Sequence, residues 1–164
     1  PHYPAARLWS DDHDLRLEGE EPRFPMEITS FSERFKGQPQ SAAPWLLHWT
    51  PGDLGADFGS AVRLFLNQDR EDFTERFLEG DRSTMQVVLS DTMIQVIRAV
   101  LLRPDLDAES DVQEGSVLWQ ARYWMNLAFP HLKVPAVRSL LEAHPASFHA
   151  GILAAADVVG EEAE

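Results

Sequence analysis

The sequence predicts an α+β fold, with an N-terminal antiparallel sheet of about four strands followed by a C-terminal bundle of four to five helices. Apolar residues alternate with polar ones within 15–66 and then follow helical spacing within 67–160. Because the strands come first and the helices second, a segregated α+β architecture is favoured over repeated βαβ units. The length suits one domain over 1–164, with an extended N-terminal segment at 1–14 and a frayed tail at 161–164.

The first two strands are predicted to form a hairpin. Leu15 and Leu17 alternate with charged residues, and after a Gly-Glu-Glu-Pro turn the alternation resumes at Phe24, Met26 and Ile28.

Two further strands are predicted after an irregular polar connection, Ser30 to Ala43. The third strand is Trp45 to Trp49 and the fourth is Ala61 to Leu66. Pro51 and Gly52 follow the third strand in the order that a type II turn requires, with glycine accepting a positive φ.

The helical pattern begins with Glu71 to Glu79, and Gly80 is the expected left-handed residue after its end. Ser83 and Gln86 have capping-box spacing, which predicts that a second helix begins there and ends near Leu102, just before a proline.

Three more helices complete the pattern. One runs from about Val112 to Phe129, with Asp111 and Glu114 as a second candidate capping box. The next begins at Pro135 and stops at His144-Pro145, and the last carries an apolar stripe closed by Gly160. We expect that stripe to consist of Phe148, Ile152, Leu153, Ala156 and Val159.

Two of these helices are more apolar than a surface helix needs. Within 85–102 and 112–129, apolar side chains extend well beyond the roughly 100° stripe that faces a core. Both helices should therefore be packed on several sides, either inside the chain or between subunits.

Composition excludes several classes of function. With no cysteine, the chain has no zinc-thiolate site, iron–sulfur cluster or cysteine nucleophile. The formal charge of −13 disfavours direct binding to nucleic acid or to an anionic membrane. No apolar run reaches the roughly 20 residues of a membrane span.

We expect a cytoplasmic protein without a secretory signal or cofactor, and the opening Pro-His-Tyr-Pro suggests a domain of a larger protein.

One short cluster could carry catalysis. Asp11, Asp12, His13 and Asp14 combine oxygen and nitrogen ligands that suit a divalent cation, although neighbouring residues of an extended segment point to opposite faces. A hydrolase or metal-dependent enzyme with an acidic site is the resulting alternative hypothesis. An acidic mimic of nucleic acid, or a sequestering protein, is the second alternative.

The leading hypothesis is a non-catalytic protein–protein interaction or assembly domain. Trp119 and Tyr123 lie one helical turn apart, on the side of their helix away from Val117 and Ala121. With Arg122 and Trp124 they form the candidate contact surface, since Trp, Tyr and Arg anchor many interfaces. The partner would be another protein or a second copy, whereas core filling would explain the same aromatic residues without a partner.

Overall fold

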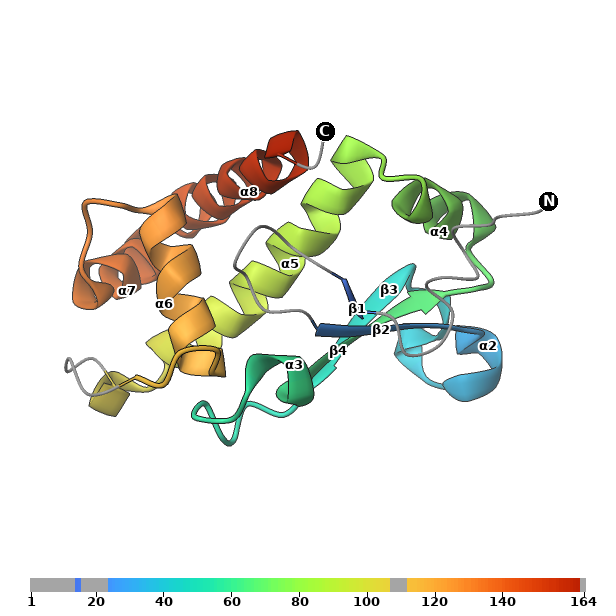
Figure 1. Cartoon of the computed structure of the whole chain (residues 1–164), viewed down its shortest axis with the longest axis horizontal. Helices are drawn as coiled ribbons and strands as arrows, with labels where there is room; N and C mark the ends of the chain where they lie inside the picture. The colour runs from blue at the N-terminus through green and yellow to red at the C-terminus, as the bar shows by residue number, and fades with distance from the viewer. Residues whose placement is uncertain (1–13, 16–23, 107–111, 163–164) are drawn as a thin grey trace.

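The computed structural model describes residues 14–15, 24–106 and 112–162, and it confirms a mixed α+β fold. The long helix α5 crosses the molecule between a small sheet on one side and helices α6, α7 and α8 on the other (Figure 1). The elements are β1 (Asp14–Leu15), β2 (Phe24–Thr29), α2 (Phe31–Arg34), η1 (Pro39–Ala42), β3 (Trp45–Trp49), α3 (Phe58–Ala61), β4 (Val62–Asn67), α4 (Glu71–Leu78), α5 (Arg82–Leu101), η2 (Pro104–Leu106), α6 (Val117–Ala128), α7 (Val134–Ala143) and α8 (Pro145–Glu162).

The sheet is mixed, so the expectation of a four-stranded antiparallel sheet is wrong. Within the described residues its main strands are β2, β4 and β3, with β4 in the middle. β4 pairs antiparallel with β3 but parallel with β2, placing Met26 opposite Leu64. Alternation of apolar residues shows which face of a strand is buried, but it carries no information about the direction of its neighbour.

The predicted hairpin is described only at its two ends. Asp14 and Leu15 of β1 pair antiparallel with Pro25 and Phe24 of β2, as a hairpin requires. The connecting residues 16–23, which include Leu17, lie outside the described part of the chain.

Two details of the connections differ from expectation. The segment predicted to be irregular contains the single turn α2 and the 3-10 turn η1. Gly52 does not have a positive φ, so the predicted type II turn is wrong; the described glycines with positive φ are Gly37, Gly80 and Gly115.

Helix α4 ends as predicted, but α5 begins differently. Gly80 has φ +79°, and the amides of Gly80 and Asp81 donate to the carbonyls of Phe77 and Arg76, which is a Schellman motif. The N-cap of α5 is then Asp81, not Ser83, because the Asp81 carboxylate accepts from the Thr84 amide at 3.0 Å and from its hydroxyl at 2.6 Å.

This capping also favours the ionised form of the Asp81 carboxyl. The hydroxyl of Thr84, followed by its amide, holds the pKa of the Asp81 carboxyl below its ordinary value. The predicted capping-box partner Gln86 instead donates to the Leu153 carbonyl at 2.8 Å and ties α5 to α8.

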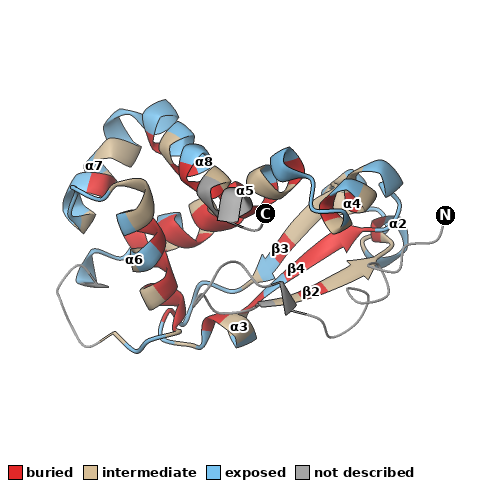
Figure 2. Ribbon diagram, turned by 45° about the horizontal axis from the view of Figure 1, so that its top comes forward, coloured by how far each residue is buried: buried red, intermediate tan, exposed pale blue. Residues whose placement is uncertain are grey.

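Helix α5 is the centre of the core. It packs most extensively against α8 and also contacts α6, α7 and α4, and its buried residues run along much of its length (Figure 2). By length and composition it is the one described helix that could cross a membrane, and 56% of its most apolar window is buried here. The described elements therefore cover much of the wide apolar surface that the sequence predicted for this helix, although Val87 and Leu102 remain exposed.

Helix α6 begins at Val117, five residues later than predicted, and not through a capping box of Asp111 and Glu114. Gly115 has φ +87°, which a right-handed helix cannot include, and Ser116 is the N-cap, with its hydroxyl accepting from the Trp119 amide at 3.1 Å. Asp111 lies outside the described residues.

The loop between β3 and α3 secures this helix start. The amides of Val117 and Leu118, which have no partner inside a helix, donate to the carbonyls of Ala56 and Leu54, both at 2.9 Å. The Phe58 amide donates to the Gly115 carbonyl at 2.8 Å. The sheet half of the chain thus fixes both the position and the direction of α6.

The last two helices follow the predicted order. Pro135 lies in the first turn of α7, and α8 starts at Pro145. Helix α8 continues through Gly160 to Glu162, so the prediction that Gly160 closes it is wrong. A close approach occurs earlier in α8, where a Cβ added to Gly151 would lie 2.7 Å from the Phe129 ring.

Candidate functional site

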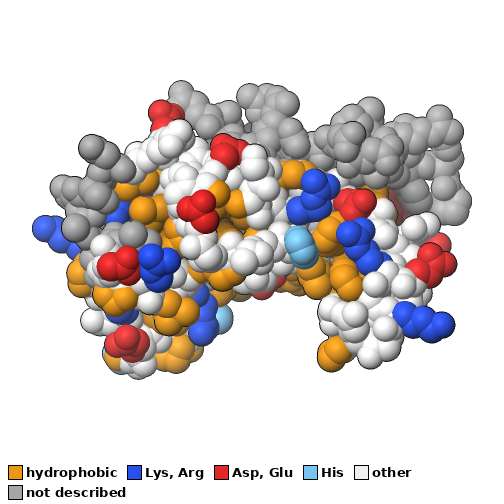
Figure 3. Space-filling model, turned by 90° about the horizontal axis from the view of Figure 1, so that it is seen from below, with side chains coloured by type: hydrophobic (Ala, Val, Ile, Leu, Met, Phe, Trp, Pro, Cys, Tyr) orange, Lys and Arg blue, Asp and Glu red, His pale blue; other side chains and the backbone are white. Residues whose placement is uncertain are grey.

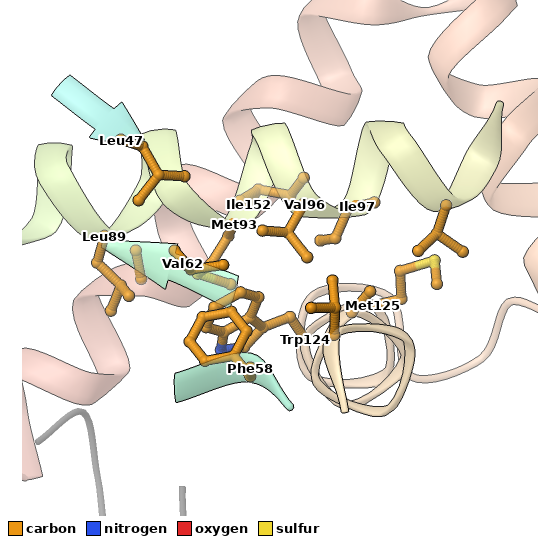
Figure 4. Packing of buried hydrophobic residues seen from close by; sticks show 14 of the residues in the cluster. Leu47, Phe58, Val62, Leu89, Met93, Val96, Ile97, Trp124, Met125 and Ile152 are labelled. Atoms are coloured by element: carbon orange, nitrogen blue, oxygen red, sulfur yellow. The ribbon is translucent and has the colours of Figure 1, made fainter. Parts of the chain in front are cut away.

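The candidate contact surface lies on α6, whose two faces differ sharply. The inner face carries Trp124, which is 0% exposed and packs edge-on against Phe58 with ring centroids 5.5 Å apart. From α6 this indole points toward α3 and α5 (Figure 4). Trp124 is therefore a core residue of the folded chain and offers no surface to a partner.

The outer face carries the other predicted residues. Trp119, Arg122, Tyr123 and Asn126 have the i, i+3, i+4, i+7 spacing of a single helix face. The rings of Trp119 and Tyr123 are stacked, with centroids 5.8 Å apart and planes 19° apart. Tyr123 is 40% exposed, and Trp119 is partly buried. The structure thus brings three of the four predicted residues together on one accessible face.

A pocket of about 440 Å³ adjoins this face, between α6 and the start of α7. Arg122 and Asn126 belong to both the outer face and the pocket lining, and Lys133 lies at the start of α7. Apolar side chains complete the lining: Met125, Leu132, Val134, Pro135 and Val137. Because a ligand would meet two cationic groups beside apolar surface, the pocket suits a group that combines negative charge with apolar character.

The chain segment around this surface is unlike the rest of the sequence. Residues 115–141 contain Arg122, Lys133 and Arg138 but no Asp or Glu, although the whole chain has 27 acidic residues. The sequence itself carries this signal, but the net charge of −13 for the whole chain conceals it. Together, α6 and residues 134–141 of α7 form an acid-free region of an acidic protein, and Glu142 follows in the last turn of α7.

The predicted metal site is not tested by the structure. Asp11, Asp12 and His13 lie outside the described residues, and Asp14 is in the two-residue strand β1. Within the described part of the chain, no group of three or more His, Asp or Glu side chains could hold a metal ion.

A polar cluster that sequence reasoning missed lies where β2 and β4 end. The Asn67 side chain is 0% exposed; it accepts from the amides of Phe31 and Asp69 and donates to the Ala43 carbonyl at 2.8 Å. The Asp69 carboxylate accepts from Ser30 and Ser32 at the start of α2.

These contacts have a structural explanation. The amide of Ser32, followed by the hydroxyls of Ser32 and Ser30, holds the pKa of the Asp69 carboxyl below its ordinary value. Asp69 and Asn67 thereby accept hydrogen bonds from amides at the N-terminus of α2, where the side chain of the N-cap residue Ser30 makes no capping hydrogen bond. The cluster therefore fixes α2 and the preceding strand ends, and no nucleophile activated by a base is apparent among its members.

The sheet face opposite the core is a second surface of interest, where the exposed residues Arg34 and His48 lie against the buried Phe65. The Arg34 guanidinium lies 4.3 Å above the Phe65 ring, and His48 contacts the ring edge-on. Arg34 is paired with Glu27 at 2.9 Å. The molecule seen from below mixes apolar, basic and acidic side chains (Figure 3). Because both signs of charge are interleaved, this view does not single out a ligand class.

No protein-family model, curated protein or solved structure matches the chain. The functional interpretation therefore depends on the geometry of the site and on the sequence.

Proposed function

We propose that this chain is a non-catalytic protein–protein interaction or assembly domain that contacts its partner through the outer face of α6. The stacked pair of Trp119 and Tyr123 on an accessible helix face is the observation that carries the proposal. Trp, Tyr and Arg are the residue types most often found at the energetic centre of interfaces, and this face holds all three.

The way α6 is held favours the same role. Its N-terminal amides are bound to the loop before α3, and its inner face is packed in the core. The two outer rings are already stacked before a partner arrives. Binding would then require little further ordering of the contact residues, which lowers the entropic cost of association.

Site-specific photo-crosslinking tests the proposal. A benzophenone amino acid is placed at Asn126 on the outer face, and a matched control carries it at Ser83, an exposed residue in the first turn of α5. In the cells that produce the protein, we expect an adduct from position 126 that is absent from position 83. The adduct should disappear when Trp119→Ala and Tyr123→Ala are added.

The mass of the adduct distinguishes the two kinds of partner. Twice the mass of the chain indicates self-association, and any other mass indicates a different protein. Equal crosslinking from positions 126 and 83, or an adduct that persists without the two aromatic side chains, would contradict the proposal.

A further inference from the structure

We infer that the partner presents an acidic, partly apolar protein segment, whose carboxylate enters the pocket between α6 and α7 while its apolar part lies on Trp119 and Tyr123. This inference rests on the proposed function, because it identifies the kind of partner that the same face would recognise.

The pocket lining has the chemistry for such a segment. Arg122 and Lys133 contribute positive charge, Asn126 contributes an amide, and none of the described lining residues carries a carboxylate. The buried side chains of Met125 and Val137 form part of the apolar wall. A carboxylate beside a short aliphatic or aromatic group would satisfy both parts of this lining.

The pocket and the aromatic pair form one continuous surface. Arg122 and Asn126 lie on the helix face that carries Trp119 and Tyr123, and both also line the pocket. A segment that crosses α6 over the two rings would therefore reach the cationic pocket within a few residues. One short linear segment of a partner is enough to occupy the whole surface.

Charge complementarity selects an acidic segment. Lys133 makes no ion pair with any described residue. The chain has a formal charge of −13, so most of its surface would repel an acidic segment. The acid-free residues 115–141 would attract the segment and guide it to one place.

Charge repulsion also favours a different protein over a second copy of this chain as the partner. A two-fold contact through this face would place the same patch of each copy against the other. Arg122 and Lys133 of one copy would then approach their own equivalents, and no acidic residue of 115–141 could compensate for them.

Selection from a random peptide library tests the inference with a defined probe. A displayed library of random twelve-residue peptides is selected on the full chain, and the selected peptides are measured against three variants. Lys133→Glu reverses the charge of the pocket, Trp119→Ala removes half of the aromatic pair, and Lys36→Glu is the control. Lys36 is the only other lysine of the chain; it is exposed beyond α2, and its substitution changes the net charge equally.

We expect the selected peptides to be enriched in Asp and Glu next to an apolar residue. Their affinity should fall about tenfold or more with Lys133→Glu and change little with Lys36→Glu. It should also fall when the salt concentration rises, because charges at a partly open site are screened. Thermal melting of each variant confirms that it is folded.

The outcomes separate the inference from the proposed function. Peptides that require Trp119 but have no acidic enrichment, or that bind Lys133→Glu as well as the parent, would overturn the inference and leave the interaction face intact. Acidic peptides that require Lys133 but not Trp119 would support the pocket and contradict the aromatic contact. Selection of no peptide that depends on either residue would overturn both.

Discussion

The two faces of α6 carry similar residues with opposite surroundings. Trp124 on the inner face is 0% exposed and packed against Phe58, whereas Trp119 on the outer face is stacked on Tyr123, which is 40% exposed. Both tryptophans belong to one nearly uncharged helix. Position on the helix, set by the loop that fixes its N-terminus, therefore decides whether an aromatic residue is buried in the core or lies on an accessible face.

The largest effect should come from the inner face. Trp124→Ala removes a fully buried side chain and leaves a cavity next to Phe58 and α5. We expect the free energy of unfolding to fall by about 3 to 5 kcal/mol, as for other large-to-small substitutions of core aromatics. Denaturant unfolding measures this free energy, and a decrease of less than about 1 kcal/mol would mean that Trp124 is not a core residue.

A substitution on the same inner face should have the opposite sign. The Gln120 side chain is 0% exposed, and neither of its polar atoms has a hydrogen-bond partner among the residues that the structure describes. Gln120→Met keeps a similar volume without the unsatisfied amide, so we expect stability to rise by about 1 to 3 kcal/mol. A lower melting temperature for this variant would show that the amide has a favourable partner in solution.

The start of the helix should have an intermediate effect. Ser116 caps α6 through its hydroxyl, so Ser116→Ala should reduce stability by about 1 kcal/mol. Ser83→Ala is the matched control, because Asp81 and not Ser83 caps α5. Similar losses in the two variants would contradict the assigned caps, and thermal melts of both proteins decide the question.

The outer face should affect stability least. Tyr123→Ala removes the stacking with Trp119 from an accessible position, and we expect a stability loss of about 0.5 to 1 kcal/mol. Partner binding should weaken by about 2 kcal/mol or more, because central aromatic residues dominate such contacts. A stability loss as large as that of Trp124→Ala would remove the distinction between the two faces.

The sequence predicts the elements better than it predicts their contacts. Local spacing predicts strand β3, and glycine conformation predicts the end of α4 at Gly80. Helical spacing also places Trp119 and Tyr123 on a different face of α6 from the buried Ala121. Local spacing does not predict the parallel pairing of β2 and β4, because β4 inserts between two strands that precede it in the chain.

The same limit applies to the candidate site. Helical spacing places Trp119 and Tyr123 on one face, but Trp124 is assigned to the core only once Phe58 is known to pack against it. The late start of α6 depends on amides that bind the distant loop at Leu54 and Ala56. The pocket joins α6 to the following helix, and its lining cannot be read from either helix alone.

We propose that a partner, and not the chain itself, covers the outer face of α6. Because the chain has no cysteine, single variants Asn126→Cys and Ser83→Cys can be labelled without background. Their rates of reaction with a thiol reagent are compared in purified protein and in a native extract of the producing cells. We predict that the thiol of the Asn126→Cys variant reacts more slowly in the extract, while the rate for the Ser83→Cys variant is unchanged. Equal rates for the Asn126→Cys variant in purified protein and in extract would contradict the proposal.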